Sequence, residues 1–192
     1  QRLTLEDGVT HRFIKNLKID GDFQDMEETN VQITADSGIR KVAKLTLLPE
    51  ENPLVHLTDP EGKQISVPEE GILITRKLAE LLGVSAGDSV ELKIPGENNK
   101  TVKVTGIASM TFGQGIYAGN RYWEALGGDY EPGSLLVKWN AKPDRNILNS
   151  SRIVRTIDRE QQKRDFESNI NIVNVAAVML IVSGSSLAFV VI

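Results

Sequence analysis

The sequence predicts an α+β fold, mostly antiparallel β-sheet, followed by a stalk helix and a transmembrane helix. Three observations predict it. Short runs of alternating apolar and polar residues are separated by turn-forming Gly, Pro, Asn and Asp, as in antiparallel sheets. Residues 71–108 combine a strand, a helix and a hairpin in one regular unit. Residues 168–192 contain no charged side chain and are rich in Ile, Val and Leu.

The composition is that of a globular domain, with 40% hydrophobic residues, 25% charged residues and a net charge of −4. Because nucleic-acid phosphates attract basic surfaces, we expect no nucleic-acid partner. The chain has no cysteine, which excludes disulfides and thiolate metal sites. The residues before the apolar segment are enough for one domain, or for two small lobes that share a core.

The N-terminal residues predict a strand rather than a targeting segment. Residues 2–18 mix polar and charged side chains and lack the apolar centre of a signal peptide. Phe13, Leu17 and Ile19 indicate an initial strand, and an acidic loop is expected over residues 20–28. Because the chain begins at Gln1 and stops inside an apolar run, we expect it to be part of a longer protein.

Two hairpins are predicted next. Asp36-Ser37-Gly38 carries turn chemistry between two β-rich runs. In Asp59-Pro60-Glu61-Gly62, Pro fixes φ and Gly accepts a positive φ, so a second turn is expected. The paired runs are 31–33 with 39–48, and 54–57 with 64–67.

Residues 71–108 form the most regular stretch. A strand over residues 72–74 leads to Thr75, which can cap a helix, and Gly83 can end that helix in the left-handed conformation. A turn at residues 86–88 then leads to two alternating strands. The buried face of the helix is expected to consist of Leu78, Ala79, Leu81 and Leu82. The apolar positions of the two strands are Val90, Leu92, Ile94, Val102, Val104 and Ile107. We interpret the unit as structural scaffold.

Glycine and aromatic residues follow this hairpin. Residues 111–117 lack the Lys-Ser or Lys-Thr pair of a phosphate-binding loop, so a flexible edge segment is expected. A short helix that ends at residues 127–128 and a strand over residues 135–139 come next. Four aromatic side chains can pack in the core or can line an apolar cleft for a lipid or peptide, and core packing is the favoured interpretation: Tyr117, Trp123, Tyr130 and Trp139.

A charged helix over residues 146–167 is expected to run without a proline or glycine break into the apolar segment 168–192. About 20 apolar residues cross a hydrocarbon core of about 30 Å, so we predict one membrane span. A buried core helix is the alternative, although such a helix usually keeps a polar stripe.

Small residues in the predicted span favour close contact with other membrane helices, because helix association in lipid relies on close packing. These residues are Ser183, Gly184, Ser185 and Ala188. A lone anchor that happens to contain small residues is the alternative. Four basic residues before the span would by themselves favour a cytoplasmic domain: Arg155, Arg159, Lys163 and Arg164.

No catalytic or metal-binding pattern is found. His11 and His56 lie far apart in sequence and lack the spacing of a metal pair, and neither Gly-x-Ser-x-Gly nor His-Glu-x-x-His occurs. We therefore predict no catalytic, cofactor-binding or metal-binding residue and no enzyme. A membrane-attached enzyme, with carboxylates converging from distant segments, is the less favoured alternative.

Residues 71–92 and 102–107 resemble the extracytoplasmic domain of FtsX-like permeases, which are membrane subunits of ABC transporters in the same superfamily as the MacB and LolC types. The resemblance includes the stretch Leu-Gly-Val-x-x-Gly-Asp and covers about residues 71–192. Its motif positions, interpreted as structural, are Leu82, Gly83, Gly87, Asp88 and Gly106.

The resemblance implies a cell-membrane protein whose residues 1–167 are extracytoplasmic. Residues 1–145 would form the outer domain, residues 146–167 a stalk that transmits motion, and residues 168–192 the start of the membrane region. It also implies an ATP-binding cassette subunit, bound through parts outside this chain, and a second permease copy, but no cofactor.

The implied role is non-catalytic: to handle or sense a lipid or peptide, or to regulate a cell-wall enzyme. A module for surface binding or adhesion, anchored by a single span, is the alternative from a different class of protein.

Overall fold

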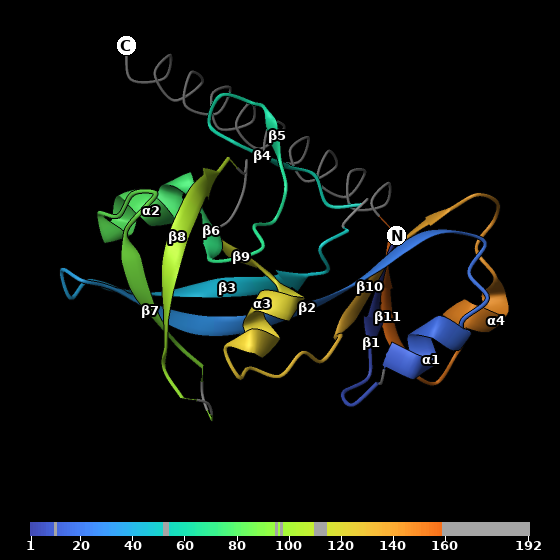
Figure 1. Ribbon diagram of the computed structural model, residues 1–192. Coiled ribbons are helices and arrows are strands. Elements are labelled where there is room, and N and C mark those ends of the chain that lie inside the picture. Colours follow the sequence, from blue (N-terminus) through green and yellow to red (C-terminus); the bar gives the residue numbers. More distant parts are fainter. Residues whose placement is uncertain (10, 52–53, 95, 97, 110–114, 159–192) are drawn as a thin grey trace, which may run out of the picture. The chain divides into compact units, whose positions relative to one another are not determined.

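The computed structural model describes residues 1–9, 11–51, 54–94, 96, 98–109 and 115–158 (Figure 1). Contacts divide the chain into Leu3–Thr156 and a second unit of Gln1–Arg2 with Ile157–Ile192. In the second unit, the Gln1 side-chain amide donates a hydrogen bond to the Asp158 carboxylate at 3.4 Å. The elements are β1 (Arg2–Leu5), α1 (His11–Asn16), β2 (Gly21–Ala35), β3 (Arg40–Leu48), β4 (Leu57–Thr58), β5 (Gln64–Ile65), β6 (Ile72–Thr75), α2 (Arg76–Leu82), β7 (Ser89–Lys93), β8 (Lys100–Ala108), β9 (Gly115–Gly119), α3 (Asn120–Ala125), β10 (Ser134–Trp139), α4 (Arg145–Leu148) and β11 (Ile153–Ile157).

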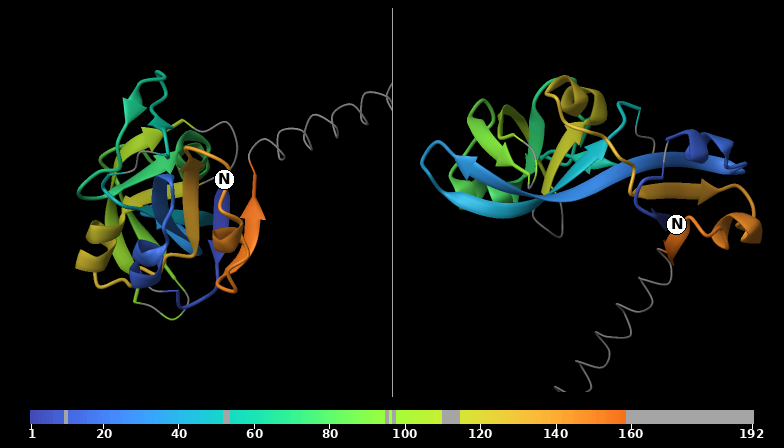
Figure 2. Two further views of the ribbon diagram at one scale, coloured as in Figure 1. Left: turned by 90° about the vertical axis from the view of Figure 1, so that its right-hand side faces the viewer. Right: turned by 90° about the horizontal axis from the view of Figure 1, so that it is seen from below.

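Six of these strands pair in a closed ring, a small β-barrel (Figure 2). β2 pairs with β3, β3 with β9, β9 with β6, β6 with β8, β8 with β7, and β7 returns to β2. The pairs β3–β9 and β6–β8 are parallel, and the other four are antiparallel. The prediction of a mostly antiparallel α+β fold is confirmed in part. Closure gives each barrel strand a hydrogen-bonded neighbour on both sides, which removes exposed edges.

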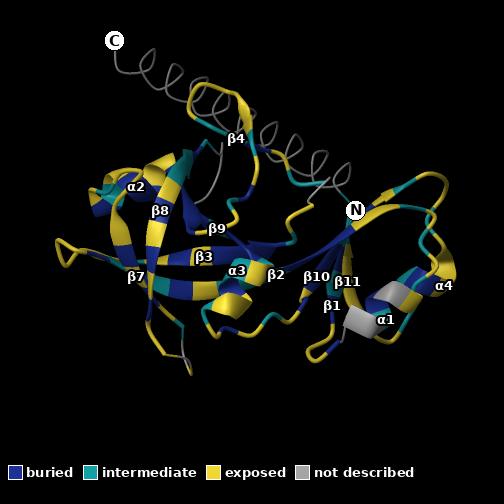
Figure 3. Cartoon of the chain, in the orientation of Figure 1, coloured by how far each residue is buried: buried dark blue, intermediate teal, exposed yellow. Residues whose placement is uncertain are grey.

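The barrel interior is filled by apolar side chains from alternate strand positions. Burial alternates residue by residue along β7 and much of β8, as Figure 3 shows. α2 adds Leu78, Ala79 and Leu82 to this core, and α3 adds Trp123. Each large side chain removed from water contributes about 1.5–3 kcal/mol. The strand residues of the core are Val31, Ile33, Ala35, Ala43, Leu45, Leu47, Ile72, Ile74, Val90, Leu92, Val102, Val104, Ile116 and Ala118.

A second, four-stranded sheet has the order β11-β1-β10-β2 and uses the first part of β2. It has its own core, to which α1 contributes Ile14 and α4 contributes Ile147. The other buried members of this core are Leu3, Leu5, Val9, Leu135 and Val137. We call residues 27–131 the barrel section, and residues 3–26 with 132–156 the sheet section.

β2 belongs to both sections. Its residues 21–26 pair with β10, and its residues 27–34 pair with β3. The predicted acidic loop over residues 20–28 is therefore wrong from residue 21 onward. The acidic residues are held in a strand because neighbouring strands supply backbone hydrogen bonds along it, a tertiary effect that outweighs the low strand preference of Asp and Glu.

The predicted initial strand at Phe13, Leu17 and Ile19 is also wrong, because residues 11–16 form the helix α1. Ile14 is 1% exposed, and Phe13 and Leu17 pack against the same core. The spacing of residues 13, 14 and 17 places them on one side of a helix, and this periodicity was the better guide. The strand of this region is β1, nearer the N-terminus.

The predicted stalk helix over residues 146–167 is wrong for its first part. α4 ends at Leu148, and β11 occupies residues 153–157. Ile153, Val154, Thr156 and Ile157 are β-branched, which lowers helix preference and favours a strand. Residues 159–167 of the stalk and the span 168–192 lie outside the described residues. Among the residues that are described, no helix has the length and apolar character needed to cross a membrane.

Both predicted hairpins are confirmed. Gly38 and Gly62 occupy their turns with φ of 84° and 85°, and the second hairpin has strands of two residues each. β9 corrects another expectation, because residues 115–117 lie in a barrel strand between β3 and β6 rather than in an edge segment. Residues 111–114 of that segment lie outside the described residues.

Candidate functional site

The motif residues from the family resemblance occupy structural positions in and around the barrel: Leu82, Gly83, Gly87, Asp88 and Gly106. Gly83 ends α2 in the left-handed conformation with φ 68°, as predicted. Leu82 is fully buried in the barrel core. The Asp88 carboxylate accepts a hydrogen bond from the Ser85 amide at 2.7 Å, which closes the turn after α2.

Two glycines of this motif lie against β8 or within it. The Gly87 amide donates to the Val104 carbonyl at 2.7 Å. A Cβ at Gly106 would lie 3.0 Å from the side chain of Leu73. Thr75 precedes α2 but does not cap it through its side chain; its hydroxyl accepts a hydrogen bond from the Gly115 amide at 3.1 Å and so joins β6 to β9. These contacts are typical of scaffold rather than of a binding site.

The four aromatic residues do not share one apolar cleft. Trp123 is 1% exposed in the barrel core. Trp139 packs against the core of the sheet section, and Tyr117 packs in a third cluster outside the barrel interior. Core packing, the favoured interpretation, describes these three. Tyr130 packs against the barrel core and also lines a cleft.

This cleft, of about 730 Å³, is lined by both sections. The sheet section contributes Gly8, Val9, Asp25 and Pro132. The barrel section contributes Pro49, Glu50, Glu51, Asn120, Arg121, Glu124, Tyr130 and Glu131. Because these residues come from the loop after β1, the middle of β2, the loop after β3, and α3 with the segment after it, the fold assembles the cleft from four separate stretches of sequence.

The cleft is acidic. Its lining carries five carboxylates, Asp25, Glu50, Glu51, Glu124 and Glu131. The basic residue Arg121 is paired with Glu50 at 2.7 Å. This ion pair ties the loop after β3 to α3, although both side chains are exposed and an ion pair of this kind contributes little to stability. We refer to this region as the acidic cleft.

Tyr130 and Asp25 both line the acidic cleft. Burial of the Tyr130 phenol raises its pKa, and the nearby negative charges of Asp25, Glu27 and Glu124 raise the pKa further. Asp25 itself is 8% exposed.

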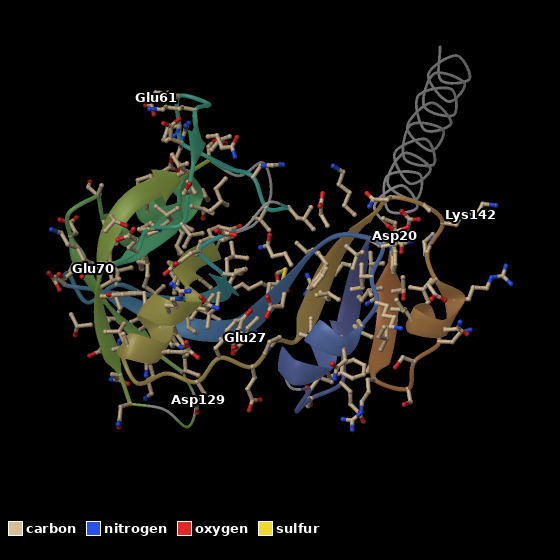
Figure 4. The ribbon with its side chains drawn as sticks, turned by 45° about the vertical axis from the view of Figure 1, so that its right-hand side comes forward. Asp20, Glu27, Glu61, Glu70, Asp129 and Lys142 are labelled. Atoms are coloured by element: carbon tan, nitrogen blue, oxygen red, sulfur yellow. The ribbon has the colours of Figure 1, made fainter. Side chains whose placement is uncertain are left out.

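A short polar contact lies beside this pair. The Glu27 carboxylate of β2 accepts a hydrogen bond from the backbone amide of Glu131 at 2.7 Å. In Figure 4, Glu27 lies on β2 next to the segment that leaves α3. Hydrogen bonds to a charged acceptor are about twice as strong as neutral ones. The contact therefore joins the two places where the chain passes between the sections.

The histidines and the possible metal-ligating groups were among the candidate site residues considered from the sequence. No group of three or more His, Asp or Glu side chains among them is placed to hold a metal ion. The ring of His56 lies 3.5 Å from the Gln64 amide nitrogen. His11 lies in α1 rather than in a strand-like region.

The fold is similar to that of two solved extracytoplasmic regions. The extracellular domain of the ABC-type transporter YknZ from Gram-positive bacteria matches with a TM-score of 0.53 and 14% identity, over 78% of this chain and 88% of that one. The periplasmic region of MacB from Actinobacillus actinomycetemcomitans matches with a TM-score of 0.52 and 11% identity, over 78% of each chain.

The resemblance predicted from residues 71–107 is thus confirmed for the fold. No protein-family model matches the chain, and no curated protein matches it in sequence. At the identities above, the likeness is one of architecture.

Sequence reasoning missed the acidic cleft. Glu50 and Glu51 were visible as an adjacent pair, but adjacent carboxylates on a strand or loop are normally solvated surface. Their neighbours in the cleft lie about 70 residues further along the chain, since Arg121 pairs with Glu50 across a separation of 71 positions. One available signal was the single basic residue of α3, which is followed by three carboxylates at 124, 129 and 131.

Proposed function

We propose that this chain contains the non-catalytic extracytoplasmic domain of an ABC transporter permease subunit. The observation that carries the proposal is the fold shared with the extracellular domain of YknZ, over 78% of this chain and 88% of that one. The apolar segment 168–192 supports it, because a single apolar run of this length after a polar domain suits attachment to a membrane. Residues 1–167 would then lie outside the cytoplasm.

The strand order supports a role in transmitting motion. β11 is the last described strand before residues 159–192, and it lies beside β1 in the sheet that continues through β10 into β2. β2 then enters the barrel. Backbone hydrogen bonds couple neighbouring strands firmly, so a displacement near the membrane would be carried through the sheet section to the barrel section. In this proposal, β11 takes the place of the upper part of the predicted stalk helix.

The proposed partners are an ATP-binding cassette subunit, bound through parts of the permease outside this chain, the lipid membrane, and a second permease copy. Ser183, Gly184, Ser185 and Ala188 would allow the predicted span to pack closely against other membrane helices. The outer domain would handle or sense a lipid or peptide, or regulate a cell-wall enzyme. The acidic cleft is the feature of the described residues that we propose for such a role.

Affinity purification of the full-length membrane protein in mild detergent tests the proposal. We expect an ATP-binding cassette subunit to co-purify, and the ATPase rate of that subunit to change when the permease is present. The matched control is the protein truncated after residue 192, which keeps the domain and the predicted span and should lose the co-purified subunit, because the parts that would bind it lie outside this chain. Recovery of the protein alone, with a single span, would favour the anchored binding module instead.

A further inference from the structure

The pairing of β2 changes edge between Met26 and Glu27. The ladder with β10 begins at Met26, opposite Ser134, and runs back to Gly21. The ladder with β3 begins at Glu27, opposite Leu47, and lies on the other edge of β2. Neither ladder continues past this point. No described strand therefore pairs both with the residues of β2 up to Met26 and with those from Glu27 onward.

The chain passes between the two sections at one other place. The barrel section is a continuous stretch, so its second connection is the segment around residues 131–133 that follows α3. Pro132 lines the acidic cleft, and a Cβ at Gly133 would meet no atom within 4 Å. Hinges in proteins are commonly a few residues at the ends of elements that absorb changes in backbone angles. The segment 131–133 follows this pattern, because it lies between α3 and β10. Residues 26–27 lie inside the continuous strand β2, and the change of paired edge is what marks them.

The two faces of the junction differ. On one face, Met26 and Leu136 of the sheet section pack with Leu48 and Leu73 of the barrel section in an apolar cluster. On the other face lies the acidic cleft. A junction that is packed on one face and open on the other can rotate about the packed face. Such a rotation would change the volume of the acidic cleft.

The contact between Glu27 and Glu131 lies at the two connections themselves. The Glu27 carboxylate is on the barrel side of the edge change in β2, and the Glu131 amide, 2.7 Å away, begins the return to the sheet section. The bond uses the backbone of residue 131 and not its side chain. It ties the return segment to β2 and so limits how far the sections can separate.

We propose that residues 26–27 and 131–133 form a two-strand hinge, about which the barrel section rotates against the sheet section to open and close the acidic cleft. The contact between Glu27 and the Glu131 amide restrains the opening. The hinge does not rest on the proposed transport function, because it is a property of this chain alone and is measured on it.

The test is the distance between two spin labels across the cleft, in the whole chain in detergent. Because the chain has no cysteine, the pair Asp7→Cys and Glu51→Cys is labelled without background. Asp7 is next to the cleft residue Gly8, whose φ of 74° is left undisturbed, and Glu51 lines the opposite wall. We expect Glu27→Ala to broaden the distance distribution and shift it to longer distances.

Glu131→Ala is the matched control, because it removes one carboxylate from the same cleft and keeps the backbone amide; it should leave the distribution unchanged. A pair within the barrel section, Glu51→Cys with Ser89→Cys, should stay narrow in all variants. A single narrow distribution across the cleft that is identical with and without Glu27 would overturn the hinge.

Crosslinking gives an independent result that needs no change at Glu27. Bis-maleimides with rigid spacers of short and of long reach should both join Asp7→Cys to Glu51→Cys in one protein preparation, because an opening cleft samples a range of separations. Reaction with only one reach would contradict the hinge.

Discussion

Gly71→Ala is expected to destabilise the protein by about 2–5 kcal/mol. Gly71 precedes β6 with φ of 84°, where a residue with a Cβ costs about 1–2 kcal/mol. A Cβ would also lie 2.5 Å from the Thr105 methyl carbon and 2.7 Å from the Lys103 carbonyl oxygen. Overpacking of this kind costs about 1–3 kcal/mol. The penalty falls on the parallel pairing of β6 with β8, which the barrel needs for closure.

Gly62→Ala provides the control for Gly71→Ala. Gly62 has nearly the same φ, 85°, but its Cβ would meet no atom within 4 Å, so its cost should be about 1–2 kcal/mol from the backbone alone. Thr105→Ser, introduced with Gly71→Ala, should recover part of the loss by removing the methyl group. Denaturant unfolding followed by circular dichroism measures all three. Equal losses at Gly71 and Gly62 would show that the close approach of β6 to β8 does not matter.

Trp123→Ala is expected to cost about 3–5 kcal/mol, as large aromatic truncations in cores do. Trp123 is the α3 side chain that enters the barrel core, and it is 1% exposed. The Lys100 ammonium lies 5.1 Å from the centre of its ring, and Lys100 is itself 8% exposed. A Cβ at Gly128 would lie 2.2 Å from the indole nitrogen, so the chain after α3 follows the ring closely. The truncation would leave a cavity at this end of the barrel.

Lys100→Met separates packing from the cation–π contact at this site. It keeps an apolar stem of similar length and removes the charge, and the contact is worth about 0.5–2 kcal/mol. We expect a loss within that range, well below the loss from Trp123→Ala, in the same unfolding measurement. A larger loss of stability from Lys100→Met than from Trp123→Ala would mean that the cation–π contact, and not burial of the indole, holds α3 on the barrel.

The parts of the fold that could be predicted from sequence are those with local signals. Gly83 ends α2 because a left-handed residue is needed there, and the strands after it alternate because one side faces the barrel interior. β2 could not be predicted in full, because its acidic first part is a strand only through pairing with β10, more than 100 residues away. The sequence did not predict β11, because the charged residues around it are typical of the exposed face of a helix.

The candidate site could be predicted even less. The acidic cleft depends on which loops the fold brings together, and no local sequence pattern predicts which loops become neighbours. The contact between Glu27 and the Glu131 amide uses a backbone donor, so it leaves no mark in the residue type at position 131. The predicted packing residues Ser183, Gly184, Ser185 and Ala188 lie outside the described residues and stay a prediction.

The side of the membrane on which the domain lies tests the central proposal most directly. Glu61 is exposed in the turn of the β4–β5 hairpin, where only its backbone amide is engaged by Asp59 (Figure 4). Glu61→Cys places the only thiol in residues 1–192, and the full-length protein without this substitution serves as the labelling background. In intact cells that carry the full-length protein, a membrane-impermeant maleimide should label this thiol, while a cytoplasmic marker protein stays unlabelled. Labelling of Glu61→Cys only after lysis would place the domain in the cytoplasm and contradict the account.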